Sequence, residues 1–167
     1  MPIDQVLDDA ERGRWRTTTR ATTGLAGERD GLKYGTTGGH TVHSDEPAGL
    51  GGAGAEPTPL GYFALAAGWC VLSQLLRYAR VRKVDIVDAT CEVEIDWSLT
   101  GSVRVGDIAA SCDEVRYQIT VSSPSPTGDV EAVVALARQG CFVEQALRNT
   151  TTTTSTLDIT TRGDATR

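Results

Sequence analysis

Apolar residues fall on nearly every side of the segment between Leu60 and about Arg80. A helix that is apolar all round is enclosed by protein or by a membrane. At roughly 20 residues the segment is long enough to cross a bilayer, but Gln74, Arg77 and Arg80 interrupt it. The pattern therefore favours a buried central helix, and Pro59 suits its first turn.

Strict alternation of apolar and polar residues predicts two half-exposed antiparallel strands in the middle of the chain. The inward positions are Cys91, Val93, Ile95 and Trp97 in the first strand, and Val115, Tyr117, Ile119 and Val121 in the second. A short strand is expected at Val103–Val105, after a turn at 101–102. Cys91 points inward and Cys112 falls at the loop end of the second strand, where packing alone explains both thiols.

Weaker patterns complete the chain. Residues 14–23 and 38–43 read as a strand pair, and the Gly- and Pro-rich stretch 44–59 reads as a loop. Asp129 is expected to cap a helix that Gly140 ends, and Cys141 opens a second amphipathic helix. A last strand is expected at Thr154–Ile159. Strands and helices in this order predict a segregated α+β layout, with one domain at 14–160 and flexible ends at 1–13 and 161–167.

Composition narrows the function. The chain has 40% hydrophobic residues and a net charge of −6 without a Lys/Arg run, which argues against nucleic-acid binding. Its first residues show neither a basic start nor an apolar run, so we expect a cytoplasmic protein that is not in a membrane. In a reducing compartment, four cysteines are more plausibly catalytic, redox-active or buried than bridged.

Four short motifs resemble the OsmC/Ohr family, the osmotically induced and organic-hydroperoxide-resistance proteins. They are GERDG at 27–31, SDEPAGLGG at 44–52, PTPLGYFALAAGWC at 57–70 and GCFVEQALRNT at 140–150. Each is weak alone, but their order and separations are typical of that family over roughly residues 27–160. The resemblance implies an OsmC/Ohr-like α+β fold with antiparallel sheets around a central helix, and an intertwined homodimer with its sites at the subunit interface.

The resemblance also implies a chemistry. Cys70 would be the peroxidatic thiolate, Cys141 the resolving thiol, and Arg29 the guanidinium beside the first. A nearby cation lowers a thiol pKa, and a thiolate that attacks a peroxide oxygen becomes a sulfenic acid, which a second thiol can convert to a disulfide. No cofactor is expected; an external dithiol, lipoyl-linked or a small thiol, would reduce the disulfide. The substrate would be a small apolar hydroperoxide.

One position departs from the family. A glutamate usually follows the proline at the helix start, where it orients the arginine, but Leu60 and Gly61 follow Pro59 here. Asp45, Glu46 or Glu56 are candidate substitutes. The departure keeps two alternatives open: a Cys70 nucleophile for carbonyl or thioester chemistry, and a non-catalytic binder with an apolar pocket.

Two further groups of residues complete the candidates. Tyr62, Phe63 and Trp69 flank the Cys70 turn and are expected to line an apolar substrate pocket. His40 and His43 lie three apart on a strand, hence on opposite faces, and no zinc-type Cys/His pair accompanies them. We therefore expect no metal.

Overall fold

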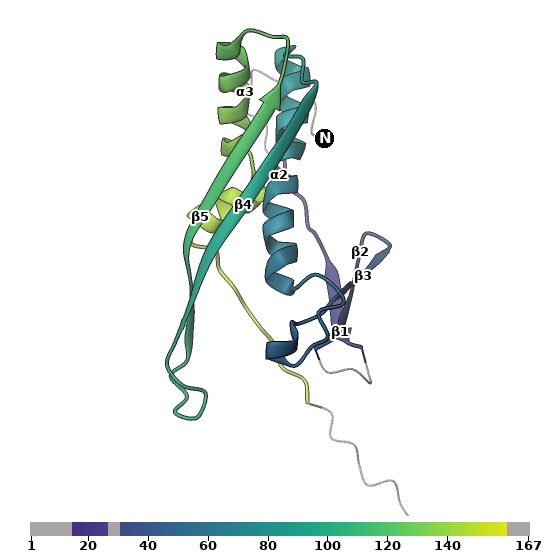
Figure 1. Ribbon diagram of the computed structural model, residues 1–167, viewed down its shortest axis with the longest axis vertical. Coiled ribbons are helices and arrows are strands. Elements are labelled where there is room, and N and C mark those ends of the chain that lie inside the picture. The colour runs from purple at the N-terminus through teal and green to yellow at the C-terminus, as the bar shows by residue number, and fades with distance from the viewer. Residues whose placement is uncertain (1–14, 27–30, 160–167) are drawn as a thin grey trace, which may run out of the picture.

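The chain is an α+β protein, as the sequence pattern predicts, in a computed structural model that describes residues 15–26 and 31–159. A small three-stranded sheet lies beyond the start of a long helix, and a two-stranded ribbon runs alongside that helix (Figure 1). The expected flexible ends, 1–13 and 161–167, lie outside the described residues. Two shorter helices follow the ribbon.

Helix α2 (Pro59–Arg82) occupies the centre of the molecule. The Thr58 hydroxyl accepts a 3.0 Å hydrogen bond from the Gly61 N–H, and Pro59 fills the first helical position. These are the residues that start a helix most readily, because the first N–H groups have no intrahelical acceptor. The helix ends at Lys83, whose φ of 56° is left-handed.

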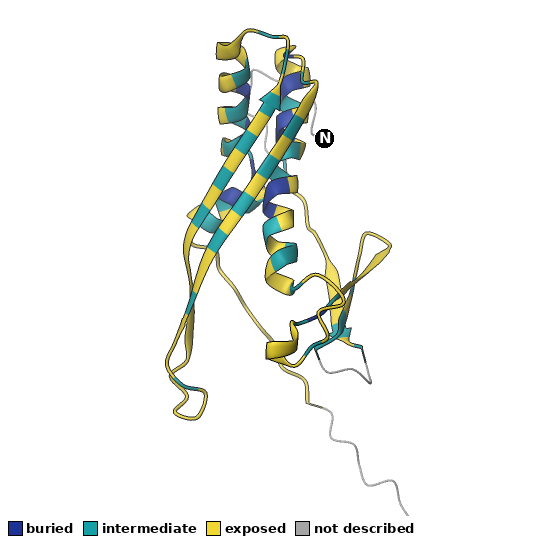
Figure 2. Cartoon of the chain, in the orientation of Figure 1, coloured by how far each residue is buried: buried dark blue, intermediate teal, exposed yellow. Residues whose placement is uncertain are grey.

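Strands β4 (Asp88–Thr100) and β5 (Ala109–Ser122) form a long antiparallel ribbon. Cys91 lies opposite Ile119 and Val93 opposite Tyr117, so the alternating apolar residues share the face toward the helices, as predicted. The register is irregular between Asp96 and Trp97. Figure 2 shows the resulting alternation of half-buried and exposed positions along both strands.

Two predictions about this ribbon are wrong. Residues 103–105 form part of the turn that joins β4 and β5, not a short strand. Cys112 lies within β5, opposite Trp97, and is exposed rather than packed. The reason is that the ribbon extends well past the helices, so its distal half has no core to pack against (Figure 1).

The N-terminal sheet contains a strand that the sequence analysis missed. Its order is β1 (Ala21–Leu25), β2 (Lys33–Thr37) and β3 (His40–Ser44), all antiparallel. Residues 38–43 thus belong with β2, and not with the first strand as predicted. Gly38 and Gly39 have φ of 56° and 83°, the pair of positive values that closes a two-residue hairpin.

Helices α3 (Thr127–Gln139) and α4 (Phe142–Arg148) follow the ribbon, and α3 ends at Gly140 as predicted. Asp129 lies in the first turn of α3 but does not cap it, because the helix begins two residues earlier. The expected strand at Thr154–Ile159 is absent from the described residues: this Thr-rich segment pairs with no other strand there. β-branched residues favour a strand only where a neighbour supplies the ladder.

The core lies where α2, α3 and the ribbon meet. Leu75, Ala79, Val84, Val133 and Ala137 are buried there, with Leu72 and Val121 among the residues packed around them. Leu75 is 1% exposed and Val133 is 1% exposed. This cluster anchors the half of α2 that follows Cys70.

Another face of α2 is not covered by the described residues. Leu65, Trp69 and Leu76 form a stripe at helical spacing and are 42%, 57% and 59% exposed. By length and composition α2 would also be able to cross a membrane, as core helices of soluble proteins sometimes would. An uncovered apolar stripe of this kind indicates a surface that binds something else.

Candidate active site

The structure brings Cys70 and Cys141 together, although they are 71 positions apart in the chain. Cys70 lies mid-way along α2 and is half-buried, whereas Cys141 is the N-cap of α4 and is 0% exposed. Their side chains lie close enough for Cys70 to raise the pKa of the Cys141 thiol. All four cysteines are free thiols. The contact of α2 with α4 is therefore a dithiol site.

The environment of Cys141 keeps it protonated. Burial raises the pKa of the Cys141 thiol to about 11, and the neighbouring Cys70 side chain contributes in the same direction. The Glu144 N–H donates to its sulfur at 3.4 Å and partly opposes this shift in pKa. At neutral pH Cys141 is thus a thiol, and Cys70 is the more accessible of the two.

Two tyrosines line the dithiol. The pKa of Tyr117 is raised to about 12, mainly by burial, and Cys141 and Cys70 contribute in the same direction. Its hydroxyl is buried and has no hydrogen-bond partner among the described residues. Burial also raises the pKa of Tyr78, and both thiols contribute in the same direction. Its hydroxyl lies so close to Gly140 that a Cβ there would collide with it. A larger residue at 140 would therefore require the Tyr78 ring to move.

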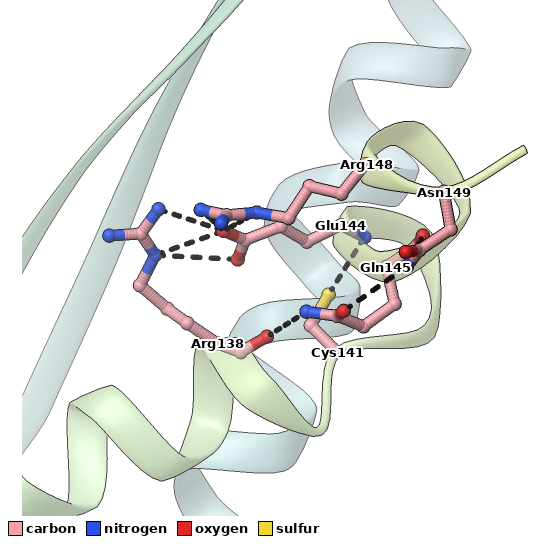
Figure 3. A network of polar contacts seen from close by, with 6 residues as sticks. All are labelled: Arg138, Cys141, Glu144, Gln145, Arg148 and Asn149. Carbon is pink, nitrogen blue, oxygen red and sulfur yellow. Dashed lines mark hydrogen bonds and ion pairs between the residues drawn. The ribbon is translucent and has the colours of Figure 1, made fainter.

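A charged cluster lies directly beside Cys141 and was not predicted. The carboxylate of Glu144 is buried, and the guanidinium groups of Arg138 and Arg148 converge on it from α3 and α4 (Figure 3). The shortest contacts are 2.8 Å from Arg138 Nη2 and 2.7 Å from Arg148 Nη2. The sequence carried a partial signal, since Glu144 and Arg148 are spaced i,i+4 on one helix.

Arg29, the third predicted site residue, lies outside the described residues. Two of the acidic residues considered as partners for it, Asp45 and Glu46, make contacts within the described residues. Glu46 forms a 3.0 Å ion pair with Lys33. Asp45 is buried and accepts hydrogen bonds from the N–H groups of Ala53 and Ala55, at 3.1 and 3.0 Å. Asp45 therefore organises the Gly-rich loop that precedes α2.

Of the three aromatic residues predicted to line a pocket, Trp69 lines an apolar groove among the described residues. A groove of about 420 Å³ runs between α2 and β4, lined mainly by apolar residues including Leu65, Trp69, Leu72, Cys91 and Val93. Phe63 packs edge-on against Trp97 instead, with ring centroids 5.7 Å apart.

The inward orientation of Cys91 was predicted, but its place in the groove and its proximity to Glu144 were not. It faces inward as expected, in the wall of this groove. Burial raises its pKa, and Glu144 is near enough to raise it further. Among the described residues, no group of three or more His, Cys, Asp or Glu side chains could hold a metal ion.

The family follows from comparison with known proteins. The family model described as OsmC-like protein matches residues 51–156, more than half of the chain. The chain belongs to the OsmC-like family. The matched range contains α2, the ribbon, α3 and α4, and hence both members of the dithiol. A comparison with curated protein sequences gives no significant match.

Solved structures show the same OsmC-like fold. An OsmC-like hydroperoxide resistance protein from Jannaschia sp. CCS1 is 23% identical, with a TM-score of 0.56 over 83% of this chain and 91% of that one. An OsmC-like protein from Mycoplasma pneumoniae is 15% identical, with a TM-score of 0.66 over 80% and 89%. An organic hydroperoxide resistance protein OsmC from Legionella pneumophila is 22% identical, with a TM-score of 0.58 over 81% and 92%. At these identities the likeness concerns the fold.

The buried state of Cys141 predicts how stability depends on pH. The folded protein holds this proton to a higher pH than the unfolded chain, whose thiol titrates near its ordinary value of 9.0. The thiol therefore stabilises the fold fully below pH 9, and this contribution is lost as the pH rises through about 11. Urea denaturation of the reduced protein should show a free energy of unfolding that falls above pH 9.

The matched variant for this measurement is Cys141→Ser, whose hydroxyl does not titrate in that range. Its free energy of unfolding should decline less steeply than that of the wild type over the same pH interval. Tyr117, which also titrates late, is common to both proteins and cancels in the comparison. Equal slopes for the two proteins would contradict the assignment of a buried, protonated Cys141.

Proposed function

We propose that this protein is a thiol-dependent peroxidase that reduces organic hydroperoxides through Cys70 and Cys141. The observation that carries the proposal is the contact between these two thiols, one half-exposed on the central helix and one fully buried. Membership of the OsmC-like family supports it, as do the printed names of structural neighbours that are hydroperoxide resistance proteins.

The proposed chemistry has three steps. The Cys70 thiolate attacks one oxygen of the hydroperoxide, the O–O bond breaks, and the departing alkoxide takes a proton and leaves as an alcohol. The resulting Cys70 sulfenic acid is attacked by the Cys141 sulfur; a disulfide forms, and the hydroxyl leaves as water with the thiol proton. An external dithiol then reduces the disulfide by exchange through a mixed disulfide.

The remaining groups have supporting roles in this proposal. Arg29, by the family resemblance, supplies positive charge beside Cys70, and no bound cofactor takes part. The apolar groove beside Trp69 and Cys91 suits the organic part of a hydroperoxide. We place the protein in the cytoplasm, where dithiol reductants are present. Consumption of cumene hydroperoxide in the presence of dihydrolipoamide tests the activity, and no consumption above the rate without protein would refute it.

We also propose that the protein is a homodimer. The exposed stripe of Leu65, Trp69 and Leu76 runs along α2 beside the apolar groove, and within the described part of the chain neither edge of the β4–β5 ribbon pairs with a third strand. A two-stranded ribbon of this length is marginal alone, and a second copy would cover stripe, groove and strand edges together. This arrangement is the one that the family resemblance implies.

Light scattering coupled to gel filtration without detergent should give twice the chain mass of 17.7 kDa. Trp69→Glu places a charge in the proposed interface and should shift the mass toward one chain. Val87→Glu, at a 73% exposed position outside the stripe, should remain dimeric. A wild-type monomer, or a protein that requires detergent or vesicles to stay in solution, would contradict the dimer.

A further inference from the structure

Glu144 is a buried carboxylate that none of the proposed chemical steps uses. Its residue is 2% exposed, yet it carries a formal negative charge in the corner between α3 and α4. Burying a carboxylate is costly unless it is paired and hydrogen-bonded. Here both conditions hold: Arg138 donates from Nε and Nη2, and Arg148 donates from Nε and Nη2.

These contacts join the last turn of α3 to α4. Arg138 lies at the end of α3, Arg148 at the end of α4, and both guanidinium groups meet on one carboxylate (Figure 3). A second link runs in parallel, because the Gln145 side-chain N–H donates to the Arg138 carbonyl at 3.3 Å. The angle between the two helices is thus fixed by charge-assisted hydrogen bonds, which are about twice as strong as neutral ones.

Cys141 occupies the vertex of this corner. It lies between Gly140, which ends α3, and Phe142, which begins α4. The backbone N–H of Glu144 donates to its sulfur at 3.4 Å, so the residue that carries the carboxylate also holds the thiol. Any rotation of α4 against α3 would move that sulfur relative to Cys70, which belongs to a different helix.

We propose that Glu144 is a positioning residue that holds the Cys141 sulfur against Cys70 and thereby sets the rate at which a Cys70 sulfenic acid is converted to the disulfide. The effect on the rate of disulfide formation rests on the proposed peroxidase function. The position of the Cys141 sulfur does not. The step concerned joins the two sulfurs, breaks the S–O bond of the sulfenic acid and releases water. Glu144 touches none of the reacting atoms with its carboxylate and acts only through the helix corner.

The test separates oxidation of Cys70 from formation of the disulfide. After one equivalent of cumene hydroperoxide, the wild type should pass rapidly to the disulfide, with little Cys70 sulfenic acid trapped by dimedone. Glu144→Gln keeps the volume but loses the charge, and disulfide formation should slow by about tenfold or more, since misplacing a reacting group by 1 Å can cost a hundredfold. Loss of the Cys70 thiol itself should stay within about twofold of the wild-type rate.

The matched control is Glu131→Gln, which removes the same charge from an exposed position of α3. It should form the disulfide at the wild-type rate. Should Glu144→Gln fail to fold by circular dichroism, Arg148→Met removes two of the donors from a half-exposed side chain and is expected to slow the same step. Wild-type rates of disulfide formation in folded Glu144→Gln would overturn the proposal.

A second measurement keeps this inference apart from the proposed function. In glutathione redox buffers, the equilibrium between dithiol and disulfide reports the effective concentration of the two thiols without any peroxide. Glu144→Gln should lower it by about tenfold or more, and Glu131→Gln should leave it unchanged. If the wild type does not react with hydroperoxides but has a higher effective concentration than Glu144→Gln, the peroxidase proposal is refuted and the positioning role stands. Equal effective concentrations in the two proteins would refute the positioning role.

Discussion

Replacing Cys70 by serine should reduce hydroperoxide consumption by on the order of a thousandfold or more, to the rate without protein. The hydroxyl of serine is not ionised at neutral pH, whereas a thiol provides a thiolate that attacks the peroxide oxygen. Cys141 cannot take over, because burial raises its pKa to about 11 and leaves it protonated. The measurement is consumption of cumene hydroperoxide with a saturating dithiol, with fold checked by circular dichroism.

Cys112→Ser is the matched control for this experiment, since Cys112 is an exposed thiol on the distal part of the ribbon. It should retain wild-type turnover. Equal and slow turnover by the wild type and Cys70→Ser would contradict the peroxidase proposal. Intact-mass detection of an acyl adduct on Cys70 would then support the alternative in which the same thiol attacks a carbonyl or thioester.

Replacing Leu75 by alanine should lower the free energy of unfolding by about 2–5 kcal/mol. Leu75 is 1% exposed and packs among Ala79, Val133 and Ala137, where α2 and α3 meet. The substitution removes buried methyl groups and leaves a cavity whose lining loses contacts. Because marginal stability is typically 5–15 kcal/mol, this is a large share of the total. Urea denaturation at neutral pH measures it.

Leu157→Ala makes the same chemical change at a residue that is 82% exposed and lies outside every described helix and strand. Its free energy of unfolding should stay within about 0.5 kcal/mol of the wild type. If Leu75→Ala were equally mild, the meeting of α2 with α3 would not be the core of this protein. Protein concentration must be held constant, because a dimer is stabilised by mass action.

Glu144 does not replace the glutamate that is missing after Pro59. The family glutamate orients an arginine beside the first cysteine, whereas Glu144 is bound by two arginines and lies beside the second. In the described structure, the charged side chains beside the dithiol therefore belong to α3 and α4. Because of this difference, we propose that Glu144 acts on disulfide formation and not on the ionisation of Cys70.

Local rules were sufficient where each residue's preference agreed with its surroundings. The period-2 alternation of β4 and β5 put Cys91 and Tyr117 on the inward face. Pro59 marked the start of α2, and Gly140 marked the end of α3. The same rules wrongly predicted a strand at Thr154–Ile159, where the β-branched residues pair with no described strand. They also missed β2, which is joined to β3 by a glycine-rich hairpin. Strand formation depends on a neighbour that the local sequence does not specify.

By itself, the sequence determined the α+β layout, the family resemblance and the pairing of Cys70 with Cys141 as candidates, because these follow from periodicity and from motifs along the chain. Only the tertiary structure decided that the two thiols touch, that Cys141 is fully buried, and that Glu144 gathers Arg138 and Arg148 beside it. Contacts between α2, α3 and α4 join residues far apart in the chain. Burial and charge pairing depend on how whole helices pack, which no local pattern records.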